Sequence, residues 1–408
     1  SADLPLAELR LIDVPAGKEK VEIIAALTRR QLDKAGMAHV KVSVHYDRKP
    51  ALEGVDFVIS QFRVGQLPAR ALDERIPLKY GVLGQETTGP GGFFKALRTI
   101  PAILAICRDI EEVAPNAWLL NFTNPSGILA DAIVKHTKVR TMGLCNNPIN
   151  MHLGAAKILG VEPAQVNMRY MGLNHLVWAK VFLAGEDVTP RVLEAMSAAN
   201  PTNANIAALP YDRDFLMHVG YMPCPYQRYY YMEPEMIAKE IEAARTTGTR
   251  AEVVQKTEAE LFELYKDPNL NIKPPQLAKR GGAHYSDAAV SLLNAIYNDK
   301  REVHAVNIMN GSAMPDLPAD AAVEISALIT KDGAVPLTVG PLPPQVRGLL
   351  QQVKAFEELT VAAGVTGDTN LALQALVANP FVPSVSVAKA LWAEMSEAHR
   401  AYLPQFFR

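Results

Sequence analysis

Apolar and polar residues alternate in a regular way along the first third of the chain. Residues 9–13, 40–46 and 55–60 are apolar or alternate in polarity, a pattern that favours short buried strands. Between the first two, residues 21–35 carry apolar side chains at helical spacing. Alternating strands and helices are typical of a doubly wound α/β fold with a parallel sheet. We therefore expect such a domain in this part of the chain.

The same pattern continues, with one interruption, to about residue 150. The glycine- and arginine-rich segment 63–101 interrupts it, and a long segment of this kind within an α/β unit is usually functional or mobile. A helix is expected over 102–112, followed by strands at 118–121 and 139–144. We assign residues 1–150 to the α/β domain.

The pattern after residue 150 is of another kind. Two strands joined by a tight turn are followed by mixed helices and strands, and the C-terminal part is helical. We therefore predict a second, α+β domain over residues 151–408. Its expected strands are 165–171, 176–183, 303–308 and 322–328, and its expected helices are 287–299, 345–363, 371–377 and 385–399.

Polar residues follow two of the predicted strands in the first domain. Asp13 ends the first strand, where a doubly wound fold can hold a nucleotide ribose, although an aspartate at a strand end is more often a helix cap. Asn121 and Asn124 lie at the end of the strand at 118–121, where amides can orient sugar hydroxyls or a nicotinamide. Turn formation before Pro125 is the alternative explanation. These residues are candidates for a binding site, because ligands bind at this edge of an open α/β sheet.

A thiol and an imidazole follow two further strands. Cys145 comes directly after the strand at 139–144, and His175 lies in the turn after the strand at 165–171. Together they suit a divalent transition metal. Two ligands are too few for a closed structural site, so positions would stay open for water or substrate. The alternative is a buried structural cysteine and a core histidine, which is the commoner case on spacing alone.

Arginines and tyrosines are further candidates for chemistry. Arg70 and Arg98, in the glycine-rich segment, can each hold an anion through two hydrogen bonds, although an exposed arginine is more often only solvated. Arg250 lies in another glycine-containing segment. Tyr226 belongs to an aromatic cluster at 226–231, in which most rings are expected to pack. One that reaches a polar cleft beside a metal could act as a base.

Composition narrows the class of protein. The 408 residues are 49% hydrophobic and 21% charged, with a formal net charge of −2. This balance, without a block of lysines or arginines, argues against a nucleic-acid partner. No apolar run reaches the roughly 18 residues that a membrane helix needs, so no membrane partner is expected. Three cysteines do not make a disulfide framework, which favours a cytoplasmic protein.

In their order along the chain, these motifs resemble glycoside hydrolase family 4, and most closely its 6-phospho-β-glucosidases. The resemblance covers essentially the whole chain and is carried by LRLID, RALDERIPLKYGVLGQETTGPGG, NFTNP, GLCN, GLNH, PYQRYYYM, GTRAE and RGGAHYS. It implies a Rossmann-like doubly wound sheet together with an α+β substrate and oligomerisation domain. It also implies an enzyme that uses NAD and a divalent metal, usually Mn2+, one of the exceptions to two-carboxylate glycoside hydrolysis.

The resemblance implies roles for the candidate residues. Cys145 and His175 would bind the metal, and Tyr226 would remove the C2 proton once NAD+ has taken the C3 hydride; C1–C2 elimination, water addition and re-reduction would follow. The substrate would be a phosphorylated disaccharide or aryl-glucoside, and the enzyme a homodimer or homotetramer. The remaining assignments are substrate contacts at Arg70, Asn124, Asn146 and Arg250 and cofactor contacts at Asp13 and Asn121.

Two features depart from the family pattern. The family opens with a strand and a glycine-rich turn that binds the dinucleotide pyrophosphate. This sequence starts at what reads as the second strand, so we expect the first strand and turn to be missing. Asn146 stands where relatives that act on α-linked substrates carry an acidic general acid, and an amide favours the β-linked class. Two other functions remain open: an NAD-dependent 2-hydroxy-acid dehydrogenase and a catalytically inactive sugar-phosphate sensor.

Overall fold

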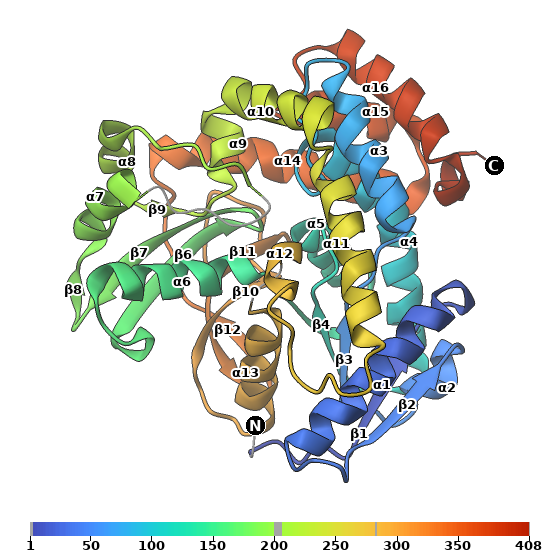
Figure 1. The fold of residues 1–408 in the computed structure, drawn as a ribbon. Helices are drawn as coiled ribbons and strands as arrows, with labels where there is room; N and C mark the ends of the chain where they lie inside the picture. Colours follow the sequence, from blue (N-terminus) through green and yellow to red (C-terminus); the bar gives the residue numbers. More distant parts are fainter. Residues whose placement is uncertain (1–2, 200–205, 282–283, 408) are drawn as a thin grey trace.

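The computed structural model describes residues 3–199, 206–281 and 284–407, and their strands form three sheets (Figure 1). A parallel pair consists of β1 (Glu8–Ile12) and β2 (Lys41–His45). The central sheet has the order β12-β11-β10-β5-β4-β3, with strands β3 (Phe57–Ser60), β4 (Trp118–Asn121), β5 (Arg140–Gly143), β10 (Val303–Met309), β11 (Ala322–Thr330) and β12 (Gly333–Pro336). The third sheet contains β6 (Val166–Leu173), β7 (Leu176–Leu183), β8 (Glu186–Asp187) and β9 (Met222–Pro223).

The central sheet combines parallel and antiparallel strands. β3, β4 and β5 run parallel, whereas β10, β11 and β12 are antiparallel additions from the second half of the chain. Within the described ranges, β1 and β3 do not pair with each other, so the parallel strands are divided between two sheets. The α/β fold class is confirmed. The domain division after residue 150 stays a prediction, and the central sheet takes strands from both sides of it.

The helices follow the strands along the chain. Those before residue 160 are α1 (Lys18–Lys34), α2 (Arg48–Leu52), α3 (Gln66–Leu78), α4 (Gly89–Val113), α5 (Ser126–His136) and α6 (Asn146–Leu159). Those after it are α7 (Thr189–Ala199), α8 (Arg213–Val219), α9 (Gln227–Tyr231), α10 (Glu233–Thr246), α11 (Arg250–Tyr265), α12 (Leu277–Arg280), α13 (Tyr285–Tyr297), α14 (Pro344–Thr366), α15 (Thr369–Ala378) and α16 (Val385–Ala398). None of the helices in the described part of the chain has both the length and the apolar character that crossing a bilayer requires.

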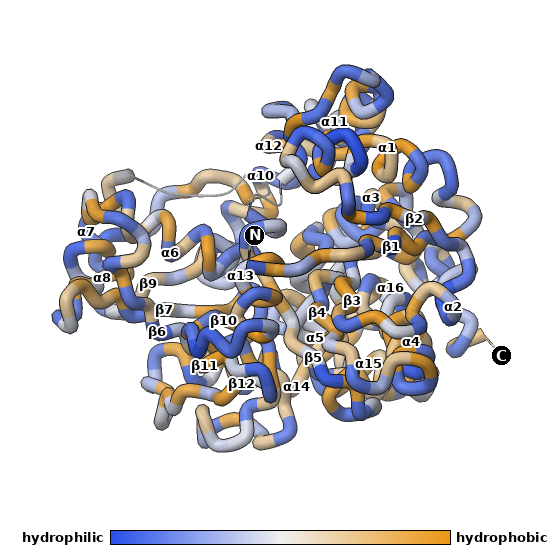
Figure 2. The backbone as a smooth tube through the Cα atoms, turned by 90° about the horizontal axis from the view of Figure 1, so that it is seen from below, coloured by the Kyte–Doolittle hydropathy of each residue, from blue (hydrophilic) through white to orange (hydrophobic). Residues whose placement is uncertain are grey.

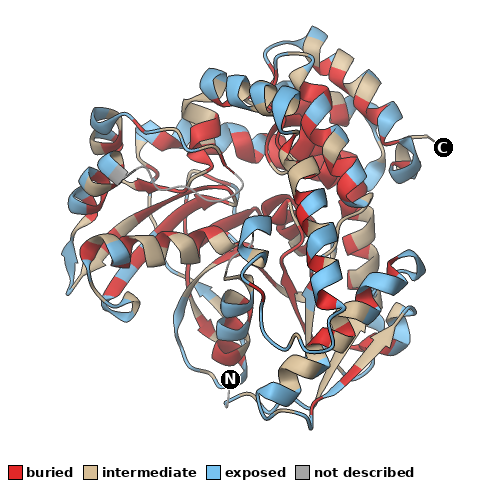
Figure 3. Cartoon of the chain, in the orientation of Figure 1, coloured by how far each residue is buried: buried red, intermediate tan, exposed pale blue. Residues whose placement is uncertain are grey.

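Helices cover the central sheet on both faces. Leu119 of β4 belongs to one apolar cluster with Leu129 of α5, whereas Leu120 belongs to another cluster with Leu292 of α13. A strand buried on both faces needs a continuous apolar run rather than alternation, which is what β4 has. Figure 3 shows buried residues concentrated in these central strands. Figure 2 shows both hydrophilic and hydrophobic residues along α1, and the helix expected over 21–35 is confirmed, with Val21, Ala25 and Leu27 buried.

The glycine-rich segment 63–101, expected to interrupt the pattern of strands and helices, is itself largely helical. It forms α3 and the first half of α4, and much of it is buried. A Cβ at Gly91 would lie 2.4 Å from the carbonyl oxygen of Gln85, and a Cβ at Gly92 would lie 2.4 Å from the carbonyl carbon of Thr87. The glycines therefore allow close packing of backbone on backbone. Gly282 and Ala283 of the predicted RGGAHYS motif lie outside the described residues.

Candidate functional site

Cys145 lies at the turn between β5 and α6. It is the N-cap of α6, and its Sγ accepts hydrogen bonds from the backbone N and the Nδ2 of Asn147, at 3.4 and 3.5 Å. The side chain is buried. Burial raises the pKa of the thiol above its usual value, and the nearby carboxyl of Glu324 adds to this, while a hydrogen bond with Asn174 opposes it. A cation beside the sulfur would therefore be needed to hold it as a thiolate.

His175 and Tyr226 stack face to face. His175 occupies the tight turn between β6 and β7 with φ of 65°, and Tyr226 directly precedes α9. Their ring centroids are 3.9 Å apart, the ring planes differ by 7°, and both side chains are buried. Cys145 is close enough to the Tyr226 phenol to raise its pKa, and the Asn174 amide, next to His175, is close enough to Cys145 to lower the pKa of its thiol. Three predicted site residues from separate elements therefore converge.

Cys145 and His175 fit a divalent metal with an open coordination sphere. Burial lowers the pKa of His175 to about 3, and Lys95 adds to the shift, so the imidazole is neutral, as a metal ligand must be. Across the described ranges, no group of three or more His, Cys, Asp and Glu side chains is placed to hold an ion. The remaining positions would fall to water or substrate oxygens, as in a catalytic site. The assignment of both ligands stays a prediction.

Arg70 and Arg250 line one cavity of about 270 Å³. Arg70 is buried; its Nε donates to Glu74 Oε1 at 2.7 Å and its Nη1 lies 3.0 Å from Glu86 Oε1. Arg250 begins α11, and its Nη2 donates to the carbonyl of Lys279 at 2.8 Å. Two guanidinium groups at one cavity are suited to a phosphate. Other residues that line the cavity are Gly84, Gln85, Tyr229, Lys239 and Glu240.

The predicted amide residues lie at the carboxyl ends of β4 and β5. Asn121 is fully buried; its Oδ1 accepts from Ser60 Oγ at 2.6 Å and its Nδ2 donates to the carbonyl of Thr123 at 3.1 Å. These contacts hold neighbouring strand ends together, and a role of Asn121 at the cofactor stays a prediction. Asn124 is half-buried after β4, and Asn146 is the first residue of α6, directly after Cys145.

Asp13 lies at the exposed carboxyl end of β1. Its Oδ1 accepts a hydrogen bond from the backbone N of Val14 at 2.7 Å. A Cβ at Gly17 would lie 2.3 Å from Oδ2, so the carboxylate lies against the turn that leads into α1. A role of Asp13 in binding the ribose hydroxyls of NAD stays a prediction.

Sequence reasoning missed the charged group around Glu86. This carboxylate contacts Arg63, Arg70 and Lys95, with Oε2 2.7 Å from Lys95 Nζ. Burial opposes ionisation of Glu86, but the three cations outweigh it and hold its pKa well below the usual value. Burial also lowers the pKa of Lys95 to about 7. The sequence signal for this group is the density of charged residues in segment 63–101, of which only arginines were candidates.

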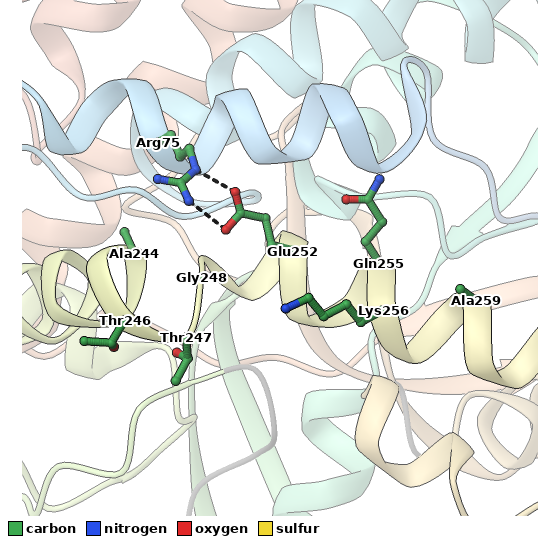
Figure 4. A pocket seen from close by; sticks show the side chains of 9 residues that line it. All are labelled: Arg75, Ala244, Thr246, Thr247, Gly248, Glu252, Gln255, Lys256 and Ala259. Atoms are coloured by element: carbon green, nitrogen blue, oxygen red, sulfur yellow. Dashed lines mark hydrogen bonds and ion pairs between the residues drawn. The ribbon is translucent and has the colours of Figure 1, made fainter.

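Two further features, Arg98 and an open hollow beside α3, lie outside the candidate site. Arg98 is buried and its guanidinium donates to both carboxylate oxygens of Asp73, at 2.9 and 2.5 Å, and it does not line the cavity that Arg70 and Arg250 share. A more open hollow of about 580 Å³ lies along α3 and α11, where Arg75 and Glu252 form two hydrogen bonds of 2.7 Å (Figure 4). None of the predicted site residues lines this hollow.

Comparison with known proteins connects these features. Residues 1–161 match the family described as family 4 glycosyl hydrolase, and residues 170–382 match the C-terminal domain of that family. The chain is 53% identical to the "Probable 6-phospho-beta-glucosidase" of Bacillus subtilis, over 99% of this chain and 92% of that protein. It is 43% identical to the 6-phospho-beta-glucosidase of Escherichia coli, over 99% of this chain and 91% of that protein.

A solved structure gives the same result. The 6-phospho-beta glucosidase of Thermotoga maritima, determined with manganese, NAD+ and glucose-6-phosphate, superposes with a TM-score of 0.88 at 35% identity. The match covers 98% of this chain and 93% of that one. The predicted family is thus confirmed: the chain belongs to glycosyl hydrolase family 4.

Proposed function

We propose that this chain is an NAD- and divalent-metal-dependent 6-phospho-β-glucosidase, which hydrolyses 6-phospho-β-glucosides to glucose 6-phosphate and an aglycone. The observation that carries the proposal is the convergence of Cys145, His175 and Tyr226 on one buried site. The names of the B. subtilis and E. coli relatives support it, as do the manganese, NAD+ and glucose-6-phosphate in the T. maritima structure.

Substrate binding follows from the charges at the cavity. Arg70 and Arg250 bind the 6-phosphate, because two planar guanidinium groups can each give a phosphate paired hydrogen bonds. Asn124 and Asn146 contact the sugar hydroxyls at the carboxyl ends of β4 and β5. Asn146 cannot donate a proton as a carboxylic acid does, which favours a β-linked substrate whose leaving group departs with other help.

The chemistry at C2 falls to Tyr226. When bound to Cys145 and His175, the metal acts as a Lewis acid on the sugar oxygens, while NAD+ at Asp13 and Asn121 accepts the C3 hydride. Burial raises the pKa of Tyr226 well above its usual value of 10, so the phenol needs a cation nearby to ionise. The stack on His175 holds the phenol in place to remove the C2 proton.

We further infer a homodimer or homotetramer located in the cytoplasm. The location is supported by the cysteines, since Cys107, Cys145 and Cys224 are all buried and none forms a disulfide. The oligomeric state is supported by the resemblance to the family. Size-exclusion chromatography with light scattering would measure the subunit number, and a monomer that turns over substrate would contradict this part of the proposal.

The proposed function is tested by its cofactor and substrate requirements. The purified chain should release p-nitrophenol from p-nitrophenyl-β-glucoside 6-phosphate only when NAD+ and Mn2+ are both present. The α-anomer and the unphosphorylated β-glucoside are the matched control substrates and should be cleaved far more slowly. A 2-hydroxy-acid dehydrogenase would keep its activity in chelator, and a sugar-phosphate sensor would bind glucose 6-phosphate without any turnover. Either result would overturn the proposal.

A further inference from the structure

The turns that carry Cys145 and His175 are joined through the middle of the central sheet. Asn307 of β10 pairs with Gly143 of β5, the residue two before Cys145, and a Cβ at Gly143 would lie 2.8 Å from the Cβ of Asn307. Asn307 also lies opposite Glu324 in the β10–β11 register, and its Nδ2 donates to Glu324 Oε1 at 2.9 Å. Glu324 is thus linked to β5, the strand that precedes Cys145.

The same carboxylate oxygen reaches the other turn. Glu324 Oε1 accepts a second hydrogen bond from the Nδ2 of Asn174 at 3.3 Å. Asn174 directly precedes His175, and its Oδ1 accepts a hydrogen bond from the backbone N of Gly127 at 3.4 Å. One oxygen atom of Glu324 therefore connects a residue of β10, which packs against the Cys145 strand, with the residue beside His175.

Stability alone does not account for a carboxyl at this place. Glu324 is 1% exposed, and its Oε2 has no hydrogen-bond partner among the residues that the structure describes. Burial raises its pKa to about 7, although the hydrogen bonds from Asn307 and Asn174 oppose the shift. A carboxyl buried without a cation costs free energy of folding. A residue kept at such a cost is a candidate for a role in the site.

We propose that Glu324 is a positioning residue for the metal site: through Asn307 and Asn174 it holds the turns of Cys145 and His175 at the separation that one metal ion requires. Residues that hold metal ligands in position without binding the metal themselves strongly affect metal affinity, because the metal binds well only over a narrow range of ligand distances. The inference rests on the proposed function, since it takes Cys145 and His175 as the ligands.

The test measures Mn2+ binding to the full chain by calorimetry, without substrate. Glu324→Met has a similar length but accepts no hydrogen bond from either amide, so Mn2+ should bind about 10- to 100-fold more weakly. Glu324→Gln keeps an oxygen that can accept from both amides, and should bind Mn2+ close to wild type. With Co2+ in place of Mn2+, the sulfur-to-cobalt absorption band should weaken in Glu324→Met and persist in Glu324→Gln.

Ser326→Ala is the matched control. Ser326 lies two residues further along β11, on the same face, and its Oγ accepts from the backbone N of Tyr170 and donates to the carbonyl of Met168. The control variant loses a buried link between β11 and β6 that does not involve either ligand turn. It should lower the melting temperature and leave Mn2+ affinity unchanged.

Three results would overturn the inference. One is wild-type Mn2+ affinity in folded Glu324→Met. Another is Mn2+ binding by Glu324→Gln that is as weak as that of Glu324→Met, which would point to the charge of Glu324 rather than its hydrogen bonds. If Glu324→Met does not fold, Asn307→Val takes its place, and unchanged Mn2+ affinity there is the third. A failure of the proposed function looks different, because Cys145→Ser would then bind Mn2+ normally as well.

Discussion

The imidazole of His175 lies flat against the phenol ring of Tyr226, with the ring planes within 7° of each other. The proposed metal ligand and the proposed base therefore share one contact surface. A change that moves one ring moves the other, so substitutions should keep the stack wherever a single role is to be tested.

Tyr226→Phe should separate bond cleavage from binding. The ring and its stack on His175 remain, so Mn2+ and NAD+ should bind with near-normal affinity, while cleavage should fall by about 10²- to 10⁴-fold, as expected for loss of a positioned base. In D2O, wild-type product should carry deuterium at C2, detected by NMR. Tyr230→Phe, whose ring packs against Phe381, is the control and should keep full activity. Full cleavage by Tyr226→Phe would remove this residue from the role of base.

Cys145→Ser and His175→Asn should each abolish Mn2+ binding and turnover. Asparagine is chosen at 175 because it tolerates the positive φ of that turn better than most residues. Thermal unfolding should stay near that of wild type, and Mn2+ affinity is measured by electron paramagnetic resonance. Cys107→Ala, a buried cysteine of α4, should bind Mn2+ normally. Normal Mn2+ affinity in either ligand variant would refute the assignment.

Arg70→Lys and Arg250→Lys should raise KM for the phosphorylated substrate. Each charge-assisted pair with phosphate is worth about 1.5–3 kcal/mol, which corresponds to roughly tenfold or more in affinity, and lysine loses the planar fork. Arg75→Lys is the control and should leave KM unchanged, because Arg75 lies on the same helix as Arg70 but is paired with Glu252. If Arg70→Lys or Arg250→Lys lowers activity on phosphorylated and unphosphorylated glucosides by the same factor, the assignment to the phosphate is wrong.

Glu240 should make stability depend on pH. Its carboxyl accepts a hydrogen bond from the backbone N of Gly84 at 2.9 Å, yet burial raises its pKa from 4.5 to about 8. The folded chain thus holds a proton that the unfolded chain has released between about pH 4.5 and 8. In that window the contribution of Glu240 to stability falls as pH rises, by at most about 1.4 kcal/mol per pH unit.

Glu240→Gln removes this titration and can still accept from Gly84. Its melting temperature relative to wild type should therefore rise steadily from pH 5 to pH 8. Glu235→Gln, an exposed residue of the same helix, should show no such trend. A constant difference between Glu240→Gln and wild type across this range would show that the carboxyl titrates at its ordinary pKa.

The sequence by itself determined the local elements and the residue types of the site. β4 and β7 have the predicted bounds, because a continuous apolar run and a regular strand pattern are set by the residues themselves. Cys145 and His175 became candidates because Cys145 directly follows a predicted strand and His175 lies in the turn after another, and ligands bind at strand ends. The family followed from the order of motifs.

Only the tertiary structure decided the rest. The glycines of segment 63–101 interrupt the predicted pattern, yet Gly91 and Gly92 lie in α4. There the backbone of Asp73 lies against Gly91 and that of Thr87 against Gly92, too close for a side chain at either position. Glu324 gave no signal in the sequence, because its meaning depends on the register of β10 with β11 and on the contact between β10 and β5. Such long-range pairing depends on where separate segments meet in space, and local sequence patterns do not contain it.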